Sequence, residues 1–86
     1  MSYRWERNDI AVVQRFLREM DGDEAAVTKA LLEIVPILKK EEILIAIEIA
    51  GQVRLYEKGR FPIEKLFESY ARLGIDPKKP GRYEYI

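Results

Sequence analysis

The reactive groups in this chain are carboxylates, amines, guanidinium groups and phenols, because the sequence contains no histidine and no cysteine. Those two residue types supply most acid–base catalysis near neutral pH, many metal ligands and all thiol nucleophiles. The five glycines form neither a GxGxxG motif nor a phosphate-binding loop. We therefore expect a protein that is not an enzyme, with no catalytic residue, no cofactor and no metal site.

Glu48 is the carboxylate with the most unusual surroundings, since it interrupts the apolar segment 43–50. A carboxylate buried in such a segment needs a partner, and in a cleft it can act as a general acid–base group. The sequence offers no second catalytic group to work with it. The favoured interpretation is a structural ion pair with an arginine such as Arg15, Arg18 or Arg54, or an exposed position on a narrow polar edge.

Two pairs of acids, Asp21 with Asp23 and Glu41 with Glu42, carry the oxygen ligands that hard cations prefer. Neither pair belongs to a loop with the ligand spacing of an EF-hand. Each pair stands where a helix is expected to begin or end, and acids at those positions cap helices. Capping is therefore the favoured interpretation of both pairs.

Two groups of basic residues provide the positive charge that a nucleic-acid backbone attracts. The second group also stands beside tyrosines, on which unpaired bases stack. Acidic neighbours and a net charge of zero lower the positive potential of both groups. Nucleic-acid binding is therefore the alternative function rather than the leading one. Its candidate residues are Arg54, Lys58 and Arg60 in the first group and Lys78, Lys79 and Arg82 in the second.

A turn at residues 21–23 contains glycine and separates two expected helices, as in a helix-turn-helix motif. A recognition helix presents arginine, lysine, asparagine or glutamine to the base edges. Two glutamates on each polar face would instead repel phosphate. The polar residues of these faces are Glu24, Thr28, Lys29 and Glu33 in the second helix and Glu64, Lys65, Glu68 and Ser69 in the fourth. An αα-hairpin that packs in a helical bundle is the favoured interpretation.

Two segments in the first half of the chain have the apolar periodicity of amphipathic helices, which would position the charged residues described above. One spans residues 9–20, with Asn8 as its N-cap. The next starts at about Glu24, with Asp23 as its cap, and Pro36 should break it because proline has no backbone donor. The side chains expected in the core are Ile10, Val13, Phe16, Leu17 and Met20 in the first helix and Val27, Leu31 and Ile34 in the second.

The last amphipathic helix begins at Pro62, since proline suits the first helical turn, and ends at Gly74. Ile75 is expected to fold back onto this helix in a Schellman motif. Glu68 and Arg72 are spaced to form an ion pair on its surface. Its expected core stripe consists of Ile63, Leu66, Phe67, Tyr70 and Leu73.

Residues 41–58, between these helices, fit two structures. The alternating isoleucines of 43–50 fit a strand, which would form a hairpin with 53–61. A helix is favoured, because the segment starts with two acids and Gly59 stands where a helix would end. Such a helix is apolar almost all round, which indicates a central helix or an oligomer interface. Gly51 inside it would permit a close crossing with another helix.

The two ends of the chain resemble each other, because aromatic residues alternate with charged ones in both. Tyr3 and Trp5 lie near the start, and Tyr83 and Tyr85 lie near the end. This alternation predicts a short two-stranded ribbon that pairs the termini and packs on the helices. We expect an all-α bundle of four main helices in one domain of residues 1–86, with an aromatic arm at 1–7, a helical core at 8–75 and a basic, aromatic tail at 76–86.

The composition favours a soluble, cytoplasmic protein of thermophilic origin. Uncharged polar residues are scarce and charged residues make up 35% of the chain, a pattern common in hyperthermophiles. Residues 1–7 are polar and aromatic, unlike the apolar core of a secretory signal. The longest apolar stretch, 43–51, is too short to cross a membrane.

The leading functional prediction is a small helical protein–protein interaction module, a subunit or adaptor of a larger assembly that also self-associates. The apolar third segment, its amphipathic neighbours and the lack of catalytic groups favour it over an enzyme. We expect a protein partner or a second copy of the chain, and no membrane. Trp5, Tyr83 and Tyr85 are the predicted anchors, because aromatic side chains carry much of the binding energy of interfaces.

Overall fold

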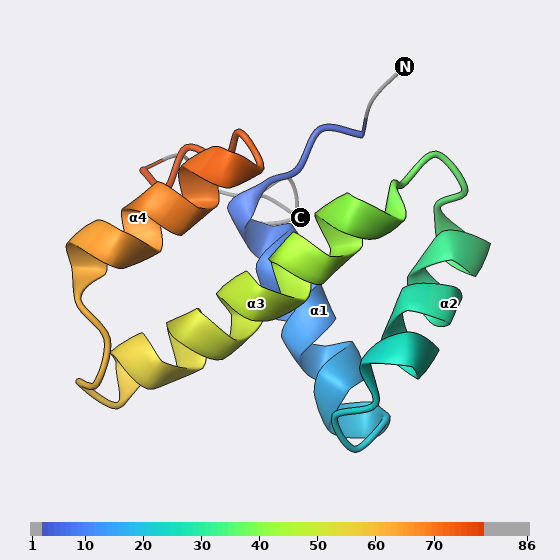
Figure 1. Cartoon of the computed structure of the whole chain (residues 1–86), viewed down its shortest axis with the longest axis horizontal. Helices are drawn as coiled ribbons and strands as arrows, with labels where there is room; N and C mark the ends of the chain where they lie inside the picture. The colour runs from blue at the N-terminus through green and yellow to red at the C-terminus, as the bar shows by residue number, and fades with distance from the viewer. Residues whose placement is uncertain (1–2, 79–86) are drawn as a thin grey trace.

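The computed structural model describes residues 3–78, and this part of the chain folds into four α-helices with no strand (Figure 1). The helices are α1 (Arg7–Glu19), α2 (Glu24–Ile34), α3 (Lys40–Glu57) and α4 (Ile63–Arg72). The predicted all-α class is therefore confirmed for the described residues. The alternative hairpin over residues 43–61 is wrong, because α3 is one continuous helix.

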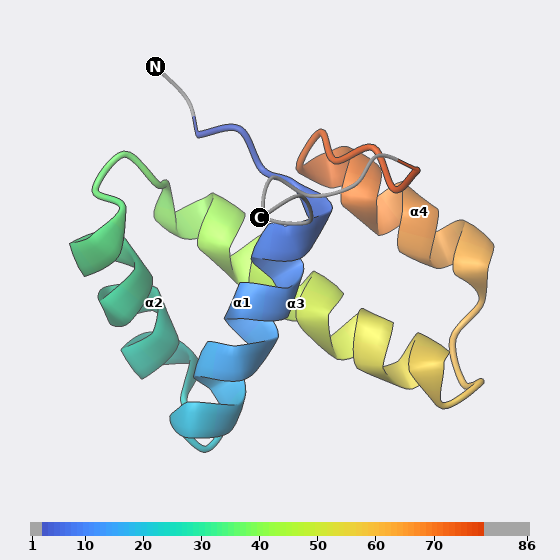
Figure 2. The same cartoon turned by 180° about the vertical axis from the view of Figure 1, so that it is seen from behind.

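Helix α3 lies at the centre of the molecule, and its backbone approaches those of all three other helices. Helix α1 crosses behind α3 in Figure 1 and in front of it in Figure 2, with α2 and α4 on opposite sides of this crossing. Helix α4 approaches only α3, whereas α2 also approaches α1. The crossing of α1 and α3 differs from the nearly parallel packing of a four-helix bundle.

Three of the helices end in Schellman motifs, in which a left-handed residue lets the chain fold back. After α4, Gly74 has a φ of 70°, and the Ile75 amide donates to the Tyr70 carbonyl at 3.0 Å, as predicted. Gly59 has the same role after α3. After α1 the left-handed position is held by Asp21, with a φ of 53°. These motifs set the short turns that bring consecutive helices together.

The helix starts agree with the predictions in part. Asp23 caps α2, as expected, and its carboxylate accepts a hydrogen bond from the Ala26 amide at 3.1 Å. The prediction that Asn8 caps α1 is wrong, because α1 begins at Arg7 with Glu6 as its N-cap. The Asp9 carboxylate reaches back to the Glu6 amide at 2.7 Å, which satisfies that donor and favours the earlier start. Helix α4 likewise begins one residue after Pro62, not at it.

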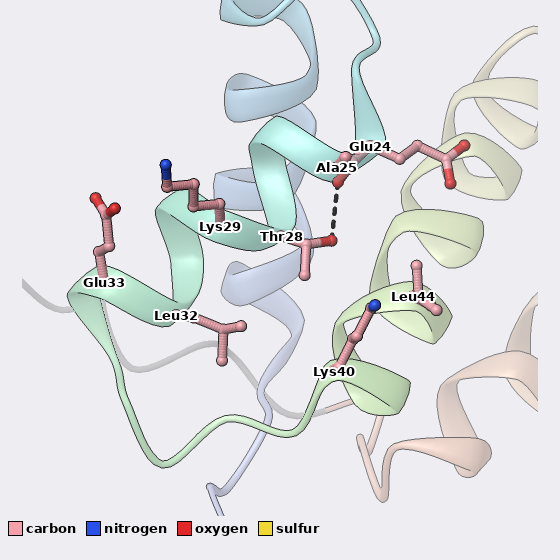
Figure 3. Close-up of a pocket in the computed structure, with 8 residues that line it drawn as sticks. All are labelled: Glu24, Ala25, Thr28, Lys29, Leu32, Glu33, Lys40 and Leu44. Carbon is pink, nitrogen blue, oxygen red and sulfur yellow. Dashed lines mark hydrogen bonds between the residues drawn. The ribbon is translucent and has the colours of Figure 1, made fainter.

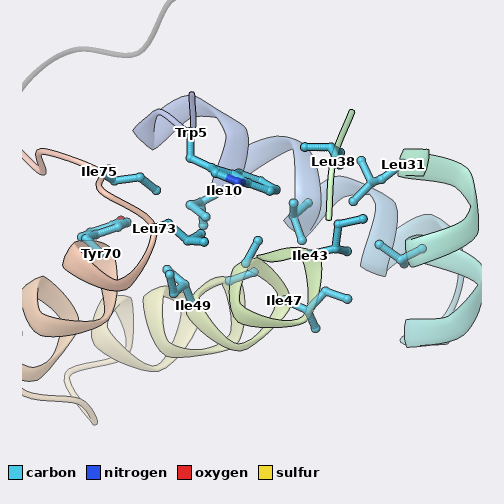
Figure 4. Packing of buried hydrophobic residues seen from close by; sticks show 14 of the residues in the cluster. Trp5, Ile10, Leu31, Leu38, Ile43, Ile47, Ile49, Tyr70, Leu73 and Ile75 are labelled. Carbon is cyan, nitrogen blue, oxygen red and sulfur yellow. The ribbon is translucent and has the colours of Figure 1, made fainter. Parts of the chain in front are cut away.

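The core lies where α1, α2 and α4 meet α3 (Figure 4). Ile43 and Ile49 of α3, Val13 of α1 and Val27 of α2 are its largest fully buried side chains. Burial of each such side chain stabilises the fold by about 1.5–3 kcal/mol. The core also includes the residues after α4, since Ile75 is buried beside Leu73 and Tyr70 (Figure 4).

Some side chains expected in the core are exposed. Ile34, at the end of α2, is 64% exposed, because the helix stops there and the chain turns away toward α3. Ile63 and Phe67 are 38% and 39% exposed, since α4 packs against α3 alone and leaves part of its apolar stripe uncovered. The fold therefore leaves apolar surface at both of its edges.

The predicted terminal ribbon has only its first half within the described residues. Residues 3–6 form no strand, and the residues proposed to pair with them lie outside the described part of the chain. In this segment the Tyr3 hydroxyl donates to the Asp9 carboxylate at 2.9 Å, and the Tyr3 ring contacts the Trp5 ring edge-on at 5.1 Å between centroids. These contacts hold the N-terminal segment against α1.

Candidate functional site

A mainly apolar groove of about 540 Å³ lies between α2 and the start of α3 (Figure 3). We call it the α2–α3 groove. Leu32 of α2 and Leu44 of α3 line it from opposite sides, and Leu44 is 44% exposed. Four charged residues surround these apolar side chains. The complete lining is Glu24, Ala25, Thr28, Lys29, Leu32, Glu33, Lys40 and Leu44.

The polar groups of this groove are the Thr28 hydroxyl, the carboxylates of Glu24 and Glu33 and the amines of Lys29 and Lys40. The Thr28 hydroxyl donates to the Glu24 carbonyl at 2.8 Å, so it is engaged within its own helix (Figure 3). The groove can therefore accept apolar side chains and pair with charges of either sign around its edge.

The groove was not predicted from the sequence, although one signal points to it. Leu44 lies on the same side of α3 as Glu48 and Gly51, away from the buried isoleucines, and all three are exposed. Packing in the core of a single chain does not explain a leucine at this position. Its position relative to α2 depends on the turn at residues 35–39, which periodicity does not define.

Glu48 is exposed and forms an ion pair with an arginine of another helix, as predicted, but with a different arginine from those named. Its carboxylate accepts from the Arg72 guanidinium at 2.6 Å, and the two side chains are 52% and 49% exposed. Arg15, Arg18 and Arg54 were wrong as partners, since the packing of α4 on α3 brings Arg72 to Glu48 instead. The spacing within α4 had suggested a pair of Arg72 with Glu68, but in the described structure Arg72 pairs with Glu48 instead. Glu48 is thus a surface residue that joins two helices.

The structure separates the basic residues that were predicted to bind nucleic acid. Arg54 lies near the end of α3, and Lys58 and Arg60 are exposed at the turn into α4. Lys78 follows α4, at its other end, where its amide donates to the Asp76 carboxylate at 2.9 Å. The length of α4, about 15 Å, lies between these positions. Lys79 and Arg82 lie outside the described residues.

Arg54 has basic neighbours that were not predicted. With Arg15 and Arg18 of α1, it lines a hollow of about 360 Å³ beside the crossing of α1 and α3. These side chains come together because α1 crosses α3 near Ala50, where the Gln14 amide donates to the Ala50 carbonyl at 3.1 Å. Sequence spacing alone cannot reveal such a meeting of two helices.

Of the three predicted aromatic anchors, only Trp5 is among the described residues; Tyr83 and Tyr85 lie outside them. Trp5 is 5% exposed and packs in the core (Figure 4). Its indole nitrogen has no hydrogen-bond partner within the described structure. In this conformation Trp5 stabilises the fold, and its role in a partner interface stays a prediction.

Tyr70 is a buried titratable residue of α4. Burial raises the pKa of its phenol above the ordinary value of 10.0, the positive charge of Arg7 opposes this change, and the negative charge of Glu57 adds to it. The phenol therefore stays neutral at physiological pH, which suits a core residue rather than a general base.

Three further observations concern metals, membranes and known proteins. Within residues 3–78, no group of three or more acidic residues is placed to hold a metal ion. None of the four described helices combines the length and the apolar character needed to cross a membrane. Comparison with protein families, with curated proteins and with solved structures found no match for this chain.

Proposed function

We propose that this chain is a small helical protein–protein interaction module that self-associates through the α2–α3 groove. The observation that carries the proposal is the apolar lining of this groove, with Leu32 and Leu44 on opposite sides of it and Leu44 exposed. Apolar surface gathered in one place is typical of protein interfaces.

The charges around the groove favour a second copy of the chain as its occupant. Two acids, Glu24 and Glu33, and two bases, Lys29 and Lys40, surround the apolar side chains. In a symmetric dimer the same surface of each chain faces its partner, so a self-complementary surface needs both signs of charge. The lysines of one chain can then lie opposite the glutamates of the other.

The dimer should be weak or moderate in affinity. A standard interface buries about 800 Å² on each partner, and affinity depends on a few well-packed anchors more than on area. Here Leu32 and Leu44 are the central apolar side chains, and the charged residues around them gain little from pairing in water. We therefore expect a dissociation constant in the micromolar range rather than an obligate dimer.

Sedimentation equilibrium tests this proposal with two matched variants. Leu44→Gln and Leu55→Gln each replace an exposed leucine of α3, with similar exposures of 44% and 42%, but only Leu44 lines the groove. We expect the wild type and Leu55→Gln to dimerise alike and Leu44→Gln to remain monomeric. Equal association of the two variants, or a wild-type monomer at millimolar concentration, would contradict the proposal.

The wider predictions, a place as a subunit or adaptor in a larger assembly and an origin in a thermophile, remain predictions. Nucleic-acid binding by the six basic residues named from the sequence also remains a prediction. It receives no support from the described structure, in which Lys78 lies at the opposite end of α4 from Lys58 and Arg60.

A further inference from the structure

The C-terminal halves of α1 and α3 diverge from their crossing (Figure 1), and side chains of both helices line the space between them. Two adjoining hollows, of about 360 and 460 Å³, occupy it. Both are lined by Arg18 of α1 and by Gly51 and Arg54 of α3, and Arg15 of α1 lines the first. We call these four residues and the space between them the arginine notch.

The three arginines of the notch have no hydrogen-bond or ion-pair partner within the described part of the chain, and all three are exposed. Their positions are fixed by the helices that carry them, since Arg15 and Arg18 share one side of α1 and Arg54 lies one turn after Gly51. The favourable effect of a cation near a helix C-terminus accounts for single arginines there. It does not account for three that line the same space.

Gly51 supplies a second and independent observation. It lies inside the 18-residue helix α3, where glycine costs about 1 kcal/mol relative to alanine. The predicted reason, a close helix crossing, is wrong, because a Cβ atom at this position would meet nothing within 4 Å. Because glycine has no side chain, the backbone of α3 is accessible at Gly51, and a ligand can approach it between the arginines.

We propose that the arginine notch binds a phosphate group. Guanidinium groups hold phosphate oxygens through paired hydrogen bonds, and three of them can contact one phosphate from both sides of the notch. Three acids also line the two hollows, Asp21 and Glu24 in one and Glu57 in the other, and they would repel a longer run of negative charge. The ligand is therefore a compact phosphate carried by a small molecule rather than a nucleic-acid backbone. This inference does not rest on self-association through the α2–α3 groove.

Nuclear magnetic resonance titrations of the full chain with inorganic pyrophosphate test the proposal. We expect saturable shifts of the Gly51 amide and of the Arg15, Arg18 and Arg54 guanidinium signals at millimolar ligand. Arg54→Gln should weaken binding about fivefold or more, since hydrogen bonds to charged groups contribute strongly. Arg60→Gln is the matched control, because Arg60 is also exposed but lies outside the notch. It should bind like the wild type.

A variant with a larger side chain at Gly51 separates binding from folding. Gly51→Gln should preserve or raise thermal stability, since glutamine favours helix, and should weaken pyrophosphate binding by filling the notch. The absence of saturable shifts, equal losses in Arg54→Gln and Arg60→Gln, or unchanged binding by Gly51→Gln would overturn the proposal. A parallel titration with oligothymidylate tests the source of the phosphate. We expect the oligonucleotide to bind more weakly than pyrophosphate, and tighter binding of the oligonucleotide through the same residues would contradict the proposal.

Discussion

Replacing Gly51 with alanine should make the protein more stable, and the size of the effect follows from its surroundings. Gly51 lies in the interior of α3, and an added Cβ atom would have no neighbour within 4 Å. The variant therefore gains helix propensity without a steric cost. Alanine is favoured over glycine at such a position by about 1 kcal/mol. In a domain of this size, 1 kcal/mol raises the melting temperature by about 4–8 °C.

Gly59→Ala is the matched control for this experiment. Gly59 ends the same helix but has a φ of 72°, a left-handed conformation that alanine adopts at a cost of about 1–2 kcal/mol. We expect thermal and urea unfolding, followed by circular dichroism, to show a gain in stability for Gly51→Ala and a loss for Gly59→Ala. If Gly51→Ala were instead destabilising, α3 would have to be distorted or covered at this point, and the open notch would be refuted.

Three further substitutions test the core, the surface ion pair and the buried phenol. Ile43→Ala, at a fully buried position, should lower the free energy of unfolding by about 2–5 kcal/mol in urea titrations; a loss well below this would show that Ile43 is not in the core. Glu48→Gln should lower the free energy of unfolding by at most about 1 kcal/mol, because the ion pair with Arg72 is half-exposed. The difference in stability from the wild type should shrink in high salt. Because burial raises the folded pKa of Tyr70, its contribution to stability is complete below about pH 10 and is lost as the pH rises through the folded value. Tyr70→Phe should weaken this alkaline loss of stability, and an unchanged pH profile would contradict the assignment.

The helices themselves could be predicted from the sequence, because their signals are local. Apolar periodicity, the cap at Asp23 and the glycines at 59 and 74 define four segments whose ends agree with the structure to within about two residues. The helical choice for residues 41–58 also needed only local information, since the acidic first turn and the terminal glycine outweighed the alternating isoleucines. Asn8 failed as a cap because Asp9, one residue later, satisfies the Glu6 amide.

The candidate sites could not be predicted, because they depend on how the helices pack. Neither the Glu48–Arg72 pair, 24 residues apart, nor the arginine notch has a signal in the spacing along the chain. Trp5 shows the same limit, since its place in the core depends on the path of the N-terminal segment. Two residues of α3 indicate the candidate sites. Leu44 is an exposed leucine, and Gly51 is a glycine that no turn or close contact requires.

The most direct test of the central claim is a dilution series of the wild-type protein followed through its backbone amide chemical shifts. If the α2–α3 groove is the self-association surface, the shifts that change with concentration should cluster on residues 24–33 and 40–44. The same residues should show no concentration dependence in Leu44→Gln. Shifts that stay constant from micromolar to millimolar wild-type protein, or that change only on α4, would contradict the account.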